Sequence, residues 1–168
     1  MQIRDALLPE FDRESANTRK VLERVPMDKA DWRPHPKSWD MATLADHLQG
    51  ILQWGVVTLT SDSFDVASPE AEKYRPDPAR TTEELLARFD KGRAAARAAL
   101  AAADNEHLMK PWALVNGGQT IFSMPRVAAL RAFVLNHSVH HRGQLCVYLR
   151  LNDVPVPALY GPSADEQV

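Results

Sequence analysis

Hydrophobic residues recur at spacings of three and four in four separate stretches of the chain, with polar and charged residues between them. This periodicity is typical of amphipathic helices that bury one face. The expected helices cover residues 2–25, 41–59, 81–100 and 123–151. Each is long enough to contribute a stripe of side chains to a shared core.

Cap and breaker residues set the expected ends of the first three helices. Pro26 ends the first helix, and Ser38 and Asp40 are candidate N-caps of the second. Thr81 lies three residues before Glu84, the spacing of a capping box, in which each side chain accepts a hydrogen bond from the other residue's backbone. The sequence therefore predicts where the second and third helices begin.

Two longer connections separate the expected helices. Residues 61–80 are rich in Ser, Asp and Pro, which indicates a long loop across one end of the helices. In the other connection, Asn116-Gly117 lies between two short apolar runs and predicts a small hairpin over residues 110–122. Ser123 is then expected to cap the fourth helix, with Pro125 in its first turn.

These elements predict an all-α fold. Four amphipathic helices bury all their stripes most simply as a four-helix bundle, with the longer connections between helices two and three and between helices three and four. A chain of 168 residues has the size of one ordinary domain, so residues 1–168 are expected to form a single domain. The composition, 45% hydrophobic and 25% charged, is that of a globular protein.

The charge pattern argues against nucleic acid and membrane as partners. The chain has 20 Lys and Arg against 22 Asp and Glu, and the basic residues are scattered among the acids. A nucleic-acid surface needs a basic face, and no apolar run approaches the length of a membrane span. The N-terminal residues do not resemble a signal peptide, and the one cysteine, Cys146, cannot form an internal disulfide. We therefore expect a cytoplasmic protein.

Three of the six histidines fall on the inward stripes of two expected helices. His137 and His141 are four residues apart, so they project from one helix face and both imidazoles can reach a single ion. His47 takes a stripe position between Leu44 and Ile51 on the second helix. A third imidazole can thus enter the same core.

Three neutral imidazoles and a water form a tetrahedral zinc site with an open position, the arrangement that catalytic zinc uses. Nickel, iron and cobalt accept the same ligands. The alternative is that these are core histidines, each hydrogen-bonded to a neighbouring helix. His140 is off the stripe and is expected at the rim of the site, where it orients a ligand or substrate, whereas Arg142 either meets an anionic substrate or forms a surface salt bridge.

The tryptophans carry weaker predictions. Trp32 and Trp39 are expected to pack at the entry to the second helix, and Trp54 continues its stripe into the core. Trp112, together with Phe122, is expected to cover the mouth of the site as part of the hairpin.

The sequence resembles the DinB-like (DinB/YfiT) superfamily of bacterial metal-binding four-helix bundles over nearly its whole length. Three segments carry the resemblance: Trp39–Leu48, which reads Trp-Asp-Met-Ala-Thr-Leu-Ala-Asp-His-Leu, His137–Gln144 with its His-Arg-Gly-Gln, and the closing Asp153–Gly161. The resemblance implies a divalent metal ion, zinc or nickel in preference to iron or cobalt, held by His47, His137 and His141. It also implies a homodimer.

Members of this superfamily include transferases that use bacillithiol or mycothiol and a mycothiol-dependent maleylpyruvate isomerase. The resemblance therefore implies a metal-dependent thiol S-transferase or isomerase whose small-molecule substrate is a low-molecular-weight thiol. A hydrolase that activates a metal-bound water remains open, as does a non-catalytic metal-binding or structural bundle of the stress response. A di-iron carboxylate site lacks the Glu-x-x-His motifs it requires, and a bis-histidine haem site needs two opposed axial ligands.

Overall fold

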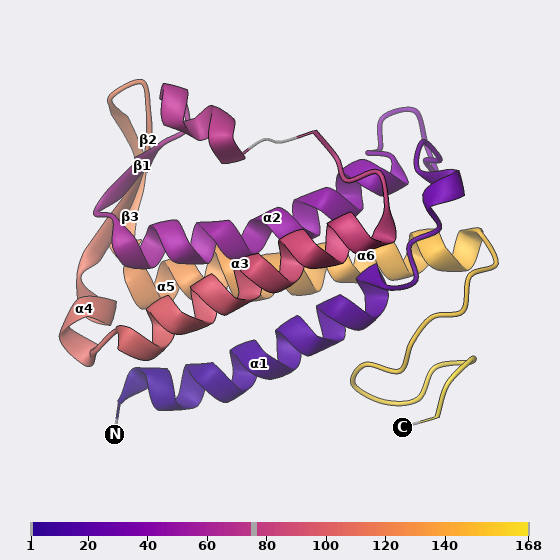
Figure 1. Cartoon of the computed structure of the whole chain (residues 1–168). Helices are drawn as coiled ribbons and strands as arrows, with labels where there is room; N and C mark the ends of the chain where they lie inside the picture. Colours follow the sequence, from indigo (N-terminus) through magenta and orange to yellow (C-terminus); the bar gives the residue numbers. More distant parts are fainter. Residues whose placement is uncertain (1, 75–76, 168) are drawn as a thin grey trace.

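The computed structural model describes residues 2–74 and 77–167 of the chain, and these are mostly helical, as the sequence predicts (Figure 1). Four long helical segments lie side by side: α1 (Ile3–Leu22), α2 (Met41–Thr60), α3 (Thr82–Ala102) and a composite of α5 (Arg126–Leu130), the π-helical turn η3 (Arg131–Asn136) and α6 (His137–Leu151). Shorter helical elements lie in the connections: η1 (Met27–Lys29), η2 (Pro69–Tyr74) and α4 (Asn105–Met109).

The predicted starts of the second and third helices are confirmed by their caps. Asp40 Oδ1 accepts a hydrogen bond from Thr43 N at 2.8 Å, and Thr81 Oγ1 accepts one from Glu84 N at 3.1 Å. The expected capping box is formed on one side only, because the Glu84 carboxylate accepts from the backbone N–H of Arg80 at 3.0 Å. One satisfied amide at each start is enough to favour the helix there.

The predicted start of the fourth helix is wrong by a few residues. Ser123 and Pro125 belong to strand β3 (Gln119–Pro125), which pairs antiparallel with β2 (Pro111–Asn116) as far as Pro125, so the helix begins at Arg126. Because β3 is paired with β2 up to its last residue, the chain stays extended through Ser123, and Ser123 cannot cap a helix that begins three residues later.

The predicted hairpin is present and belongs to a three-stranded sheet. Gly117 and Gly118 form its turn with φ values of +57° and +84°, which glycine adopts without steric cost. Strand β1 (Ser63–Asp65) pairs parallel with β2, and the Asp65 carboxylate accepts hydrogen bonds from the backbone N–H groups of both glycines. The sequence analysis missed β1 because three residues are too few to show alternation.

The apolar faces of the four long segments share one core. Its fully buried side chains include Leu22, Leu44, Leu48, Phe89 and Leu145. A smaller cluster under the sheet is built on Val57, Trp112 and Ala129, so Trp112 is a core residue of the hairpin base and not the expected cover of a site.

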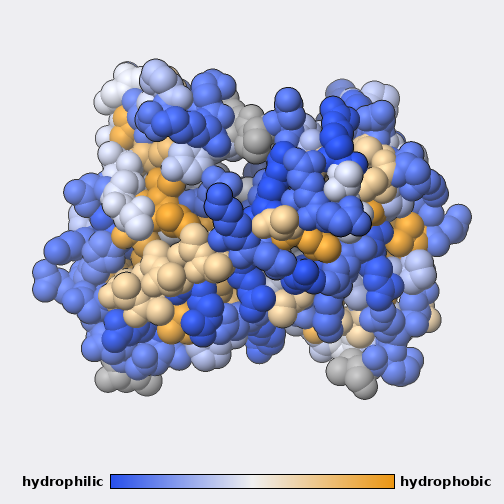
Figure 2. Space-filling view, in the orientation of Figure 1, coloured by the Kyte–Doolittle hydropathy of each residue, from blue (hydrophilic) through white to orange (hydrophobic). Residues whose placement is uncertain are grey.

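Hydrophilic residues cover most of the face in Figure 2, and hydrophobic residues gather over the left-hand halves of α2 and α3, below η2. Among the residues of α3, Ala94, Ala95 and Ala98 are exposed. Within the described residues, no helix combines the length and the apolar character that crossing a membrane requires.

Arg126 ties the sheet to the helices. It is 2% exposed, and its guanidinium donates to Pro111 O at 2.7 Å, Ser61 O at 2.9 Å and Asp62 Oδ1 at 2.7 Å. One side chain therefore joins the end of α2, the start of the hairpin and the start of α5.

Replacing Arg126 with Met should lower the free energy of unfolding by about 3 kcal/mol, because two carbonyl groups lose a donor from a buried side chain in a partly buried place. The control is Arg97→Met, which removes a half-exposed ion pair with Asp12 and should cost less than about 1 kcal/mol. Urea unfolding measures the free energy of unfolding of both variants. Equal decreases in the two variants would show that Arg126 does not hold the sheet.

Candidate metal centre

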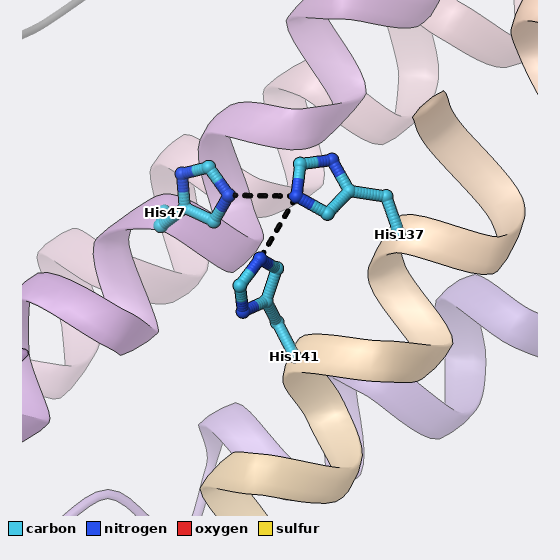
Figure 3. Close-up of side chains that lie close together, drawn as sticks. All are labelled: His47, His137 and His141. Atoms are coloured by element: carbon cyan, nitrogen blue, oxygen red, sulfur yellow. Dashed lines mark hydrogen bonds between the residues drawn. The ribbon is translucent and has the colours of Figure 1, made fainter. Parts of the chain in front are cut away.

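Three histidine rings converge across the groove between α2 and α6. His47 comes from α2, and His137 and His141 come from successive turns of α6, with the rings pointing toward one another (Figure 3). His47 Nε2 lies 3.2 Å from His137 Nε2, and His141 Nε2 lies 2.8 Å from the same atom. The structure thus brings together the three residues that the sequence singled out as ligands.

The spacing of the three rings suits one small ion. One ligand atom from each residue lies within 4.8 Å of the others. Zinc binds imidazole nitrogens at about 2.0–2.1 Å, so two ligands of a tetrahedral ion stand about 3.3 Å apart. The two measured Nε2–Nε2 distances are at or slightly below that separation, so these residues can hold a divalent ion with small side-chain adjustments.

Outer hydrogen bonds of the His137 and His141 rings leave their unprotonated nitrogens facing inward. His141 Nδ1 lies 2.7 Å from Gln144 Oε1, and an amide oxygen only accepts, so the ring carries its proton on Nδ1 and leaves Nε2 unprotonated. His137 is likewise hydrogen-bonded to the backbone of Phe133, an interaction that favours protonation of its ring. Lone pairs that face each other at 2.8 Å repel, and a cation between them removes that repulsion.

Burial keeps the three rings neutral near pH 7. Desolvation, followed by the proximity of His141 and His137, lowers the pKa of His47 from 6.5 to about 4. Burial also lowers the pKa of His137 and His141, against the raising effect of their hydrogen bonds to Phe133 and Gln144. Because a metal ion binds only the neutral imidazole, the fold removes the proton that would compete with it.

The site lies at the edge of the core rather than inside it. All three histidines are half-buried, whereas the fully buried positions of α6 are Ser138, Arg142, Leu145, Tyr148 and Leu149. The π-helical turn directly before His137 inserts a wider turn into the helix, a feature that often accompanies functional sites. An ion here would therefore be reachable from the surface.

Aromatic rings surround the triad on its outer side. The Trp39 ring stacks on His141 with centroids 5.6 Å apart and lies 4.9 Å from His47, so Trp39 covers the site rather than simply packing at the start of α2. Trp32 packs edge-on against Tyr148, as expected for a residue at that entry. His140 is exposed, with its ring 4.8 Å from the ring of His141, at the rim where the sequence placed it.

Arg142 does not lie in the site. Its side chain is 1% exposed and turned toward α1, where it donates to Glu14 Oε2 at 2.6 Å, Glu14 O at 2.8 Å and Thr18 Oγ1 at 3.1 Å, and also contacts the Tyr160 hydroxyl. Neither a substrate contact nor a surface salt bridge describes it. Position 142 follows His141 by one residue, about 100° around the helix, which turns it into the core.

A cleft of about 310 Å³ adjoins His47, with Gly50 and Trp54 of α2 along its wall. Trp54 is half-buried and packs against the core, as the sequence predicts, and it also lines this cleft, where it packs edge-on against Phe64. Sequence reasoning missed the cleft because its other wall includes Tyr74 and Pro78, which lie in a segment that the sequence presents only as a loop. The one available signal was the spacing of His47 and Trp54, seven residues apart on one helix face.

The fold and the site together define a mostly helical protein whose three-histidine centre can hold a divalent metal ion. Residues 10–145 match the DinB superfamily, so the chain belongs to that superfamily, as its sequence resemblance predicts. The match spans all three histidines of the centre.

Relatives from bacilli agree with this assignment. The chain is 26% identical over 166 residues to the uncharacterized protein YrdA of Bacillus subtilis, which covers 98% of this chain and 92% of YrdA. A DinB-like protein from Bacillus cereus has a similar structure, with a TM-score of 0.71, 21% identity, and coverage of 95% of this chain and 98% of the other. The DinB-like protein YjoA of Bacillus subtilis matches with a TM-score of 0.68, 17% identity, and coverage of 90% and 96%. At these identities the structural likeness shows the fold alone.

The lowered histidine pKa values predict how the metal-free protein responds to acid. An unfolded chain takes up protons on these histidines near pH 6.5, whereas folded His47 does so only near pH 4. The unfolded state therefore binds more protons between these values, and stability falls as the pH is lowered through this range. Urea unfolding of the metal-free protein at pH 7 and pH 5 should show this loss, and His47→Gln should lose less. An identical loss in the variant would contradict the assignment.

Proposed function

We propose that the protein is a metal-dependent enzyme that holds one zinc or nickel ion through His47, His137 and His141 in a four-helix bundle. The observation that carries the proposal is the pair of Nε2–Nε2 distances, 3.2 and 2.8 Å, among three rings, two of which, His137 and His141, are hydrogen-bonded on their outer sides to Phe133 and Gln144. Core histidines that simply hydrogen-bond to neighbouring helices would point those nitrogens at separate partners. Three protein ligands leave a position for a water or a substrate atom, as in catalytic zinc sites.

A divalent ion at this centre supplies a positive charge that lowers the pKa of a bound thiol or water and so makes it a nucleophile near neutral pH. The chain's own residues do the rest. Gln144 fixes the His141 ring, Trp39 limits the access of solvent from one side, and the cleft beside His47 gives a substrate room to approach.

The superfamily favours thiol S-transfer or isomerisation over hydrolysis as the reaction. In a transfer, the sulfur of a low-molecular-weight thiolate forms a bond to an electrophilic carbon, and the leaving group departs with the bonding electron pair. The described residues around the triad include no serine or cysteine paired with a base, so the nucleophile is expected to come from the substrate or from water.

Metal content measured by elemental analysis, on protein purified without an affinity tag, tests the proposal. Wild type should carry about one ion per chain, and His47→Ala and His141→Ala should carry almost none. Gln144→Leu should keep the stoichiometry but bind the ion about 10- to 100-fold more weakly, because the His141 ring loses the partner that orients it. The matched control is His140→Gln, an exposed neighbour that should keep full occupancy and affinity.

Turnover separates the enzyme from an inert metal-binding bundle. The metal-loaded protein is assayed with N-acetylcysteine and 1-chloro-2,4-dinitrobenzene for thiol transfer, and with 4-nitrophenyl acetate for hydrolysis. Activity that follows metal content across the variants supports the proposal. A fully loaded protein that turns over neither pair supports the non-catalytic alternative, and absence of bound ion after zinc or nickel addition contradicts the site itself.

A further inference from the structure

The cleft beside His47 extends well beyond the histidine centre. The part next to His47, about 310 Å³, shares Gln49, Gln53 and Tyr74 with a neighbouring part of about 480 Å³ that reaches Lys73 and Lys91. Because these parts share walls, they form one elongated cleft between α2, α3 and η2. Figure 2 shows hydrophobic surface below η2. The total room is in the range of small-molecule sites.

Gln49, whose amide oxygen is unpartnered, is one of the residues that line both parts of the cleft. Gln49 is 1% exposed, and its Oε1 has no hydrogen-bond partner among the described residues. Its Nε2 is 3.3 Å from Asp46 Oδ1, which also accepts from Arg88 at 3.1 Å. This contact fixes the orientation of the Gln49 amide. The Asp46 carboxylate accepts hydrogen bonds, so it faces the Nε2–H group of Gln49 and not its Oε1. A buried acceptor without a donor is costly, and a ligand that carries an N–H or O–H group removes that cost.

Aromatic rings form the side of the cleft nearest His47. Trp54 packs edge-on against Phe64 at 5.4 Å, and Phe64 packs edge-on against Tyr74 at 5.1 Å. These three rings, with His47, line a further space of about 180 Å³. A wall of this kind favours a flat apolar group, which can pack against ring faces and edges.

The far end of the cleft is cationic. Its charged lining residues are Lys73, Arg88 and Lys91. The Arg88 guanidinium is held by Asp46 and Glu84, whereas the ion pair of Lys73 among the described residues is an exposed one with Glu70, an interaction worth little in water. The lysines are therefore the groups able to meet an anion.

We propose that this cleft binds a planar aromatic molecule that carries an anionic group and a hydrogen-bond donor. Its ring lies along Trp54, Phe64 and Tyr74, its donor meets Gln49 Oε1, and its anionic group lies toward Lys73 and Lys91. The further step, that this molecule is a substrate of the histidine centre, rests on the proposed function. Binding in the cleft itself requires no metal ion.

The probe is 4-hydroxybenzoate, whose binding to the full chain is measured by isothermal titration calorimetry. The protein is stripped of metal, so that a failure of the metal proposal leaves this test unaffected. The titration is repeated with His141→Ala, a substitution outside the cleft that removes one residue of the histidine triad. Wild type and His141→Ala should bind with similar affinity. Benzoate, which lacks the donor, and 4-hydroxybenzyl alcohol, which lacks the anion, should each bind at least fivefold more weakly.

Two cleft variants assign the contacts. Gln49→Met should weaken 4-hydroxybenzoate at least fivefold and leave benzoate unchanged, a selective effect that a general loss of structure would not produce. Lys73→Gln combined with Lys91→Gln should weaken both acids but not the alcohol. The matched control is Lys110→Gln, an exposed lysine outside the cleft, which should change nothing.

Circular dichroism melting confirms that each variant is folded before titration. Failure of 4-hydroxybenzoate to bind the folded wild-type protein at millimolar concentration would overturn the proposal. So would binding that neither Gln49→Met nor the double lysine variant weakens.

Discussion

The approach of three imidazole nitrogens across the α2–α6 groove is the interaction on which the functional account depends. Unprotonated nitrogens 2.8 Å apart repel each other, and the fold nevertheless holds His137 and His141 there, with Gln144 and the Phe133 backbone engaging the outer sides of the rings. Burial suppresses protonation, which would otherwise relieve the repulsion by supplying a hydrogen bond. A divalent ion between the three rings can bind one nitrogen of each at once.

The position of α6, which carries His137 and His141, is fixed by buried polar contacts as well as by the apolar core. Arg142, the residue after His141, donates to the side chain and the backbone carbonyl of Glu14, so it sets the rotation of α6 against α1. Burial raises the pKa of Glu14, but hydrogen bonds from Tyr160 and Arg142 outweigh it and hold that pKa below its usual value. The carboxylate therefore stays charged opposite the guanidinium. Removing either partner alone leaves a buried charge without its counterion, which is strongly destabilising.

The sequence was sufficient for the helical class, for the caps at Asp40 and Thr81, for the hairpin and for the three histidines, because each rests on a local rule of spacing or capping. The sequence placed Arg142 and Trp112 wrongly. Neither the histidine stripe nor the hairpin pattern shows that the side chains of these two residues are buried against distant parts of the chain. The cleft could not be predicted at all. Its walls come from α2, α3 and, between them in the sequence, residues such as Lys73, Tyr74 and Pro78, and only tertiary packing brings Gln49 opposite Tyr74.

X-ray absorption spectroscopy of the zinc-loaded protein tests the central claim most directly, because it counts the ligands and measures their distances. We expect three imidazole nitrogens and one oxygen at about 2.0–2.1 Å, and, when a thiol is added, replacement of the oxygen by sulfur at about 2.3 Å. A spectrum with four protein ligands and no response to the thiol would describe a closed structural site. A spectrum with fewer than three imidazoles would contradict the triad.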